Sequence, residues 1–251
     1  MSLGEVVAIA LAGLAAGTIN TVVGSGTLIT FPILLAFGYA PVTANVSNTI
    51  GLVPGSISGA IGYRRELAGQ RSRAIRLGTS SVLGGATGAV LLLVLPASVF
   101  KAVVPLFIAI ALVLVVAQPR LKAMLAERDT HAVHERGLVI ALAVYLTGVY
   151  GGYFGAAQGI LLLGILGVTL AQDLHRTNAL KNVLAGLTNG VAAVYFMLAA
   201  PHVDWAPAGI IAATSILGAQ LGARYGRRLP PVALRALIVV VGITAIARLL
   251  T

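Results

Sequence analysis

Long apolar runs separated by short polar gaps follow one another along almost the whole chain. Runs of this length and composition predict membrane-spanning helices, because about 20 apolar residues are needed to cross the hydrocarbon core of a bilayer. The predicted helices cover residues 5–22, 26–38, 43–62, 74–95, 98–117, 137–154, 158–171, 177–199, 205–223 and 232–250. The pattern therefore predicts an all-α polytopic membrane protein.

Two of the predicted helices, 26–38 and 158–171, are too short to cross a bilayer. Each follows a glycine-rich interruption, "TVVGSG" at 21–26 and "GYFGAAQG" at 152–159. Glycine lets the backbone leave the helical path and lets a ligand approach it closely. We interpret these segments as short re-entrant or broken helices. The alternative is that the glycines serve only to bring neighbouring helices close together.

The chain also contains an internal repeat, with an offset near 134 residues. "SVLGGATG" at 81–88 matches "SILGAQLG" at 215–222, and "LPASVFKA" at 95–102 matches "LPPVALRA" at 229–236. A near-constant offset over several blocks predicts two related halves; the alternative is a helical bundle with accidental similarity. The predicted organisation is a first repeat at 1–117, a charged linker at 118–136 and a second repeat at 137–251.

Basic residues are placed oppositely in the two halves. The gap after the third predicted helix is rich in arginine, whereas the equivalent gap around 199–210 contains no Lys or Arg. Arg224, Arg227 and Arg228 follow the ninth predicted helix, and their counterparts in the first half are uncharged. Because basic loops face the cytoplasm, equivalent loops are expected on opposite sides of the membrane. This predicts inverted-topology repeats in a bacterial-type cytoplasmic (inner) membrane, with the linker inside and both termini outside.

Composition excludes several classes of function. The chain is 58% hydrophobic and 10% charged, whereas a soluble domain is about 25% charged. The net charge of +10 arises from basic residues in the short gaps between the apolar runs. This placement is typical of a membrane protein, so no nucleic-acid partner is predicted. The chain has no cysteine, no carboxylate within the middle of a predicted helix, and no nucleophile–base pair at a usable spacing. We therefore predict no enzyme activity, no cofactor and no metal site.

The interruptions carry the chemistry that suits an anion. Helices that begin near Ser25 and Gln158 would present free backbone N–H groups and a positive dipole end. Amide NH2 groups on neighbouring helices add hydrogen-bond donors without a permanent charge in lipid. The alternative for each asparagine is a hydrogen bond between helices. The predicted substrate-binding residues are Asn20, Gly24, Ser25, Gly26, Thr27, Asn45, Asn48, Gly155, Ala157, Gln158, Gly159, Asn178, Lys181 and Asn189.

Lys181 is the most specific of these candidates. An ammonium inside a membrane segment is costly and usually functional, so we expect Lys181 to pair with the anion. The alternative is that Lys181 extends to the cytoplasmic end of its helix and places its charge in water.

The two interruptions and the amide motifs that follow them resemble the TauE/SafE sulfite-exporter family. The motifs are "GTINTVVGSGTLITFP" (17–32) with "TANVSN" (43–48), and "GVYGGYFGAAQGILLLG" (148–164) with "RTNALKN" (176–182). The resemblance implies export or uptake of sulfite, sulfonates or related small anions. The second motif departs from the family pattern, since Gly155 is followed by two alanines.

We therefore expect a secondary transporter that binds a small, sulfur-containing anion between the two interruptions and works by alternating access. Two alternatives stay open, a passive anion channel and a non-transporting membrane scaffold or sensor. Membrane lipid is the other expected partner. The substrate, the transport direction, the coupling ion and the oligomeric state, including a homo-oligomer, are not determined by the sequence.

Overall fold

The protein is all-helical over the described part of the chain, as the apolar pattern predicts. A computed structural model describes residues 1–127, 137–225 and 231–250. The helices are α1 (Leu3–Val22), α2 (Thr27–Ala36), α3 (Pro41–Gly62), α4 (Arg71–Val94), α5 (Ala97–Ala126), α6 (Gly137–Tyr153), α7 (Gln158–Thr169), α8 (Leu174–Ala199), α9 (Trp205–Tyr225) and α10 (Pro231–Leu250). Within these residues, five helices are long and apolar enough to cross a membrane: α1, α4, α5, α8 and α9.

Each predicted apolar segment corresponds to one helix, and the differences lie at polar helix ends. Helix α8 begins at Leu174, before the apolar run, because the Asp173 side chain accepts hydrogen bonds from the N–H groups of His175 and Arg176, both at 2.9 Å. Helix α5 continues past residue 117 to Ala126. Residues 128–136 of the predicted linker, together with Arg227 and Arg228, lie outside the described residues.

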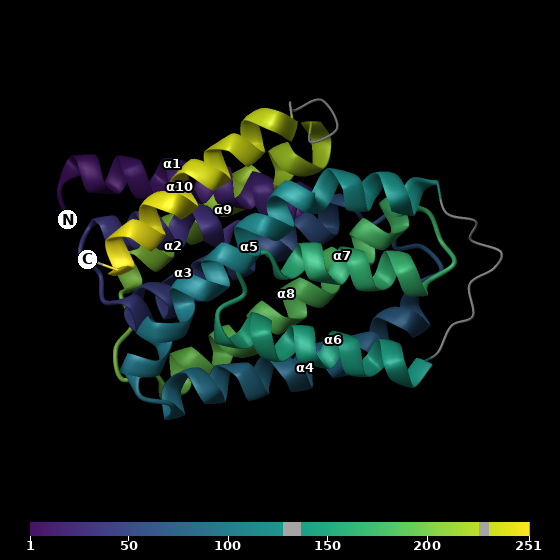
Figure 1. Ribbon diagram of the computed structural model, residues 1–251, viewed down its shortest axis with the longest axis horizontal. Helices are drawn as coiled ribbons and strands as arrows, with labels where there is room; N and C mark the ends of the chain where they lie inside the picture. Colours follow the sequence, from purple (N-terminus) through teal and green to yellow (C-terminus); the bar gives the residue numbers. More distant parts are fainter. Residues whose placement is uncertain (128–136, 226–230, 251) are drawn as a thin grey trace.

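The helix ends gather at two opposite ends of the molecule (Figure 1). The start of α1, the end of α10 and the α2–α3, α4–α5 and α8–α9 connections lie at one end, which we call the terminal end. The end of α5, the start of α6 and the α3–α4 connection lie at the other, which we call the linker end. Between the terminal end and the linker end, helices α3 and α8 pack against each other.

Helices from opposite halves pack closely in two matching pairs. Helix α1 packs along α9, and α6 packs along α4. A Cβ atom on Gly17 would lie 2.2 Å from the Ser215 carbonyl oxygen, and one on Gly84 would lie 2.2 Å from the Tyr145 carbonyl oxygen. Only glycine therefore allows these backbones to approach so closely.

Two serines that align in the sequence repeat make matching hydrogen bonds. The Ser81 hydroxyl on α4 donates to the Leu184 carbonyl on α8 at 2.8 Å, and the Ser215 hydroxyl on α9 donates to the Gly51 carbonyl on α3 at 3.2 Å. Both serines are fully buried. A hydroxyl in lipid needs such a partner, so the same helix contact is used in both halves.

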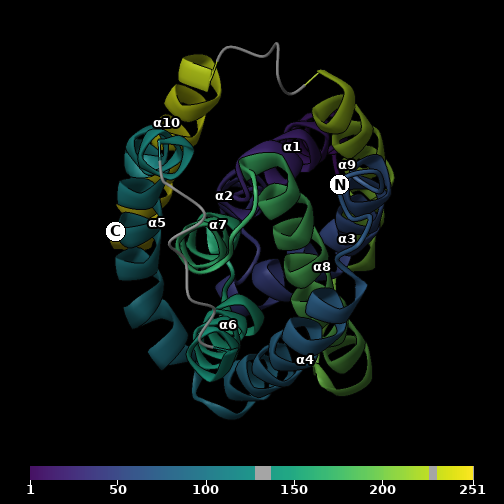
Figure 2. The same cartoon turned by 90° about the vertical axis from the view of Figure 1, so that its right-hand side faces the viewer.

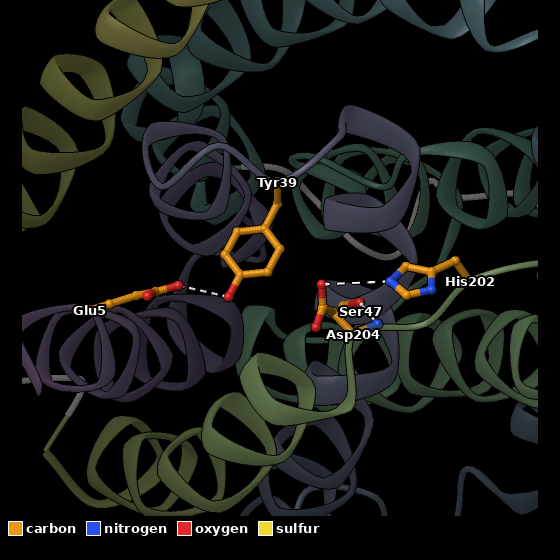
Figure 3. A network of polar contacts seen from close by, with 5 residues as sticks. All are labelled: Glu5, Tyr39, Ser47, His202 and Asp204. Atoms are coloured by element: carbon orange, nitrogen blue, oxygen red, sulfur yellow. Dashed lines mark hydrogen bonds and ion pairs between the residues drawn. The ribbon is translucent and has the colours of Figure 1, made fainter. Parts of the chain in front are cut away.

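Polar side chains hold the terminal end together (Figure 3). The Tyr39 hydroxyl, in the α2–α3 connection, donates to the Glu5 carboxylate of α1 at 2.7 Å. The backbone N–H of Asp204, just before α9, donates to the Ser47 hydroxyl of α3 at 3.0 Å. The Asp204 carboxylate lies 3.9 Å from the imidazole of His202. These contacts join α1, α3 and α9 at one end of the molecule.

The raised pKa of Tyr39 predicts that the protein loses stability at high pH. Burial, the hydrogen bond to Glu5 and nearby negative charge raise the pKa of Tyr39 to about 12, whereas an unfolded tyrosine titrates near about 10. The unfolded chain therefore loses this proton first, and the stability that Tyr39 contributes is complete below about pH 10 and falls between about pH 10 and 12. Thermal unfolding in detergent is expected to show a smaller pH-dependent decrease in Tm for Tyr39→Phe than for the wild type. An identical decrease in both proteins would contradict this, and Tyr225→Phe, at an exposed tyrosine, is the control.

Candidate functional site

Both predicted interruptions are breaks between helices. Helix α1 ends at Val22 and α2 begins at Thr27, while α6 ends at Tyr153 and α7 begins at Gln158. Gly24 and Gly155 have φ values of +92° and +76°, which favour glycine, and Ala157 has φ +60° in the same left-handed region. Helices α2 and α7, with 10 and 12 residues, would be about 15–18 Å long, well short of the roughly 30 Å hydrocarbon core.

The two breaks touch each other in the middle of the protein. The N–H of Gly159 donates to the carbonyl of Gly24 at 3.1 Å. A Cβ atom on either glycine would lie 2.5 Å from the Cα of the other. The backbones of the two halves are therefore in direct contact here, and in this conformation a ligand can bind only beside the contact, not between the two glycines.

A small polar cavity lies beside this contact. Its volume is about 10 Å³, which is room for about one water molecule. It brings together four predicted residues, Asn20, Gly24, Gly159 and Lys181, and we call it the Lys181 pocket. The remaining lining residues are Thr21, Ser56, Gly59, Asn182 and Ala185.

Lys181 is the charged group of this pocket. Its side chain is 1% exposed, and its ammonium donates to the Asn20 carbonyl of α1 at 3.3 Å. Within the described residues no carboxylate pairs with it. The alternative that Lys181 reaches water at the end of its helix does not hold, since the ammonium points into the protein. A buried charge is costly unless a group of opposite charge compensates it.

The amides of α8 bind the broken end of α1. Asn178 and Asn182 donate through Nδ2 to the Thr21 carbonyl at 3.5 and 3.3 Å. From α5, Gln118 donates through Nε2 to the Val23 carbonyl at 3.2 Å. The last carbonyls of an interrupted helix have no partner inside the helix, and these amides supply one. These NH2 groups therefore form hydrogen bonds between helices. This is the role that the sequence analysis gave as the alternative to anion binding for each asparagine.

Two predicted asparagines lie outside the Lys181 pocket, on α3. Asn45 donates through Nδ2 to the Tyr153 carbonyl at the end of α6, at 3.0 Å. Asn48 accepts a hydrogen bond from the Thr30 hydroxyl and donates to the Thr27 hydroxyl at 3.4 Å. Asn45 therefore binds the broken end of α6 as Asn178 binds that of α1. Asn189 lies about two helical turns beyond Lys181 and does not line the pocket.

Several predicted residues carry buried polar atoms without a partner. In the described part of the chain, five buried side-chain atoms make no hydrogen bond, and four of them belong to predicted site residues. The four are Ser25 Oγ, Asn45 Oδ1, Gln158 Nε2 and Asn178 Oδ1. Leaving such an atom unpaired costs about 1–3 kcal/mol, so unpaired atoms mark positions where water or a ligand binds. Each break contributes one of them, Ser25 or Gln158.

Buried aromatic rings pack directly beside the second break. Phe154, directly before Gly155, lies with its ring centroid 5.1 Å from that of Phe31 on α2 and 6.0 Å from that of Phe100 at the start of α5. All three side chains are at least 98% buried. These rings form a tightly packed aromatic cluster next to the second break.

A family model described as sulfite exporter TauE/SafE matches residues 9–249. The chain belongs to this family. It is 29% identical to "Probable membrane transporter protein ORF9" of Sinorhizobium sp over 242 residues, which cover 96% of the chain and 90% of the relative. It is 27% identical to "Probable membrane transporter protein YfcA" of Escherichia coli (strain K12) over 241 residues, which cover 94% of the chain and 86% of the relative. No solved structure gives a significant match.

Membership of the TauE/SafE family confirms the prediction made from the two interruptions and identifies the chain as a membrane transporter. Ser56, Thr21, Gln118 and Asn182 are the polar residues around the breaks that the sequence did not single out. Asn182 could have been found, because it lies four residues after Asn178 and so on the same face of the helix. Ser56 and Gln118 carry no comparable signal, since only the packing of α3 and α5 brings them to the breaks.

Proposed function

We propose that the protein is a secondary transporter of a small oxyanion, sulfite or an organosulfonate, and that the anion binds to Lys181. The observation that carries the proposal is the buried ammonium of Lys181, with no carboxylate partner in the described residues. An anion that enters the pocket supplies the missing charge. The hydroxyl of Ser56 and the amide of Asn20, which bind each other at 3.4 Å, line the same pocket and can turn to its oxygens.

The two halves form inverted repeats in this proposal. The matching pairs α1 with α9 and α6 with α4, and the matching hydrogen bonds of Ser81 and Ser215, support the division into repeats at 1–117 and 137–251. The arginines of the α3–α4 region lie at the linker end, which the positive-inside rule places in the cytoplasm. Both termini then face outward across an inner membrane.

The contact between Gly24 and Gly159 acts as a gate. The Lys181 pocket holds about one water, so the described conformation is too closed for sulfite. The two breaks belong to different halves, and a movement of one half against the other separates them and admits the anion. The buried aromatic rings beside Gly155 and the polar contacts of the terminal end favour a first opening toward the linker end. Movement of the halves then exposes the site to the terminal end.

A sulfur oxyanion is favoured over other anions for two reasons. The family is described as sulfite exporters, and one ammonium surrounded by amides and hydroxyls suits the three oxygens of a sulfite or sulfonate group.

Transport by purified protein tests the proposal. In proteoliposomes loaded with unlabelled sulfite or sulfoacetate, we expect saturable counterflow of the labelled anion, because a carrier that alternates between two states exchanges its substrate across the membrane. Taurine and thiosulfate complete the panel. A flux that does not saturate and shows no counterflow would indicate the passive channel. The absence of both flux and a ligand-induced thermal shift across the panel would indicate the scaffold or sensor.

A further inference from the structure

A second cavity lies next to the Lys181 pocket, toward the linker end. Its volume is about 120 Å³, and its lining residues come from the ends of α1 and α3, from α5 and α7, and from the start of α8. Figure 2 looks onto the linker end and shows α7 lying between α5 and α8. The lining residues are Val22, Tyr63, Lys122, Leu163, Leu174, His175 and Asn178.

The cavity adjoins the Lys181 pocket. Asn178 lines the cavity and donates to the carbonyl of Thr21, which lines the pocket. Val22, also in the cavity wall, follows Thr21 in the chain. Lys181 lies one helical turn after Asn178 on α8. The hydrogen bond from Asn178 to Thr21 therefore joins the walls of the two spaces.

The cavity is positively charged and has no acidic side chain in its wall. Lys122 is half-buried in it, and the charges of Lys122 and Lys181 are close enough to repel each other. In the described part of the chain, no carboxylate pairs with Lys122. The nearby carboxylate of Asp173 is engaged by the first N–H groups of α8. Two like charges in a region of low dielectric are unfavourable together unless an anion lies near them.

We propose that this cavity is a second anion site, an antechamber in which Lys122 binds the same sulfite or sulfonate group before it passes to Lys181. The inference rests on the proposed function for the identity of the anion. The wall combines the ammonium of Lys122 with the amide of Asn178, which can both contact sulfonate oxygens. A cleft lined by one sign of charge also concentrates ions of the opposite sign. The antechamber thus serves as the entrance or exit of the transport path at the linker end.

The absence of cysteine from the chain allows a direct measurement of charge in the cavity. His175→Cys places a single thiol on an exposed lining position and leaves Lys122 in place. Two thiol reagents are compared in detergent, MTSES, which carries a sulfonate, and MTSET, which is cationic. We expect the ratio of the MTSES rate to the MTSET rate to be about tenfold higher at this thiol than at a free thiol in solution. Lys122→Gln in this background is expected to remove most of that preference. Lys101→Gln, at an exposed lysine of the same helix, is the matched control and should leave the preference unchanged.

Protection from labelling tests binding itself. Sulfoacetate is expected to slow labelling of His175→Cys in a saturable manner, and to do so also when Lys181→Gln is added, because the antechamber binds independently. Loss of this protection with Lys122→Gln, but not with Lys101→Gln, would support the proposal. Labelling that is insensitive to Lys122→Gln, or protection that needs Lys181, would overturn it.

The two proposals fail in different ways. Counterflow with normal saturation but without protection at His175→Cys would leave the transporter in place and remove the antechamber. Protection that depends on Lys122, in a protein without any counterflow, would keep the second site and overturn the transport cycle.

Discussion

Replacing Lys181 by methionine is expected to abolish binding and transport of the anion. The substitution keeps an unbranched chain of similar length but removes the ammonium, so a bound anion would lie buried without a partner of opposite charge. Breaking a buried charge pair costs about 3–5 kcal/mol, which corresponds to an affinity roughly 100-fold to several thousand-fold weaker. Thermal shift with sulfite or sulfoacetate and counterflow in proteoliposomes measure the two losses.

The stability of the same variant separates a binding role from a structural one. The ammonium of Lys181 is buried with only the Asn20 carbonyl as a hydrogen-bond partner in the described residues, so without an anion its charge is not compensated. Lys181→Met should therefore unfold at the same temperature as the wild type or higher when no anion is present. Lys101→Met, at an exposed lysine, is the control for both measurements. A large decrease in Tm together with unchanged anion binding would show that Lys181 is structural.

The helices and the breaks could be predicted from the sequence because both depend on local properties. Apolar length marks the helices, and the left-handed φ values of Gly24 and Gly155 require the glycines that the sequence shows. The helix ends were less accurate where polar residues extend a helix beyond its apolar run. Helix α8, which begins at Leu174 because Asp173 caps it, is an example.

The arrangement of the site was only partly predictable, because it depends on which side chain reaches which carbonyl. Asn48 and Lys181 lie 133 residues apart, close to the offset of the sequence repeat. Asn48 nevertheless binds two threonines of α2, whereas Lys181 reaches the carbonyl of Asn20 on α1. The composition of the segments does not indicate which partner each of these two side chains reaches. The broken ends of α1 and α6 explain it in part, since each leaves carbonyls that a neighbouring amide must satisfy.

Two glycine-to-alanine substitutions test the contact between the halves. A Cβ on Gly159 would lie 2.5 Å from the Cα and 3.0 Å from the carbonyl oxygen of Gly24, so Gly159→Ala forces the two breaks apart and weakens the hydrogen bond between them. Overpacking of this kind costs about 1–3 kcal/mol. Gly190, also within a helix, has no atom within 4 Å of its Cβ position in the described chain. Gly190→Ala is therefore expected to preserve stability or to raise it by up to about 1 kcal/mol.

Transport should separate these variants more clearly than stability does. If the Gly24–Gly159 contact is the gate, Gly159→Ala prevents the closed state from forming, and counterflow is lost because a carrier must pass through that state between its two open ones. Gly190→Ala should transport as the wild type does. Gly24→Ala should be at least as severe as Gly159→Ala, since Gly24 also has φ +92°, a conformation that costs alanine about 1–2 kcal/mol. Wild-type Tm and counterflow in Gly159→Ala would mean that the two halves do not need this contact, and the gate would have to lie elsewhere along the path.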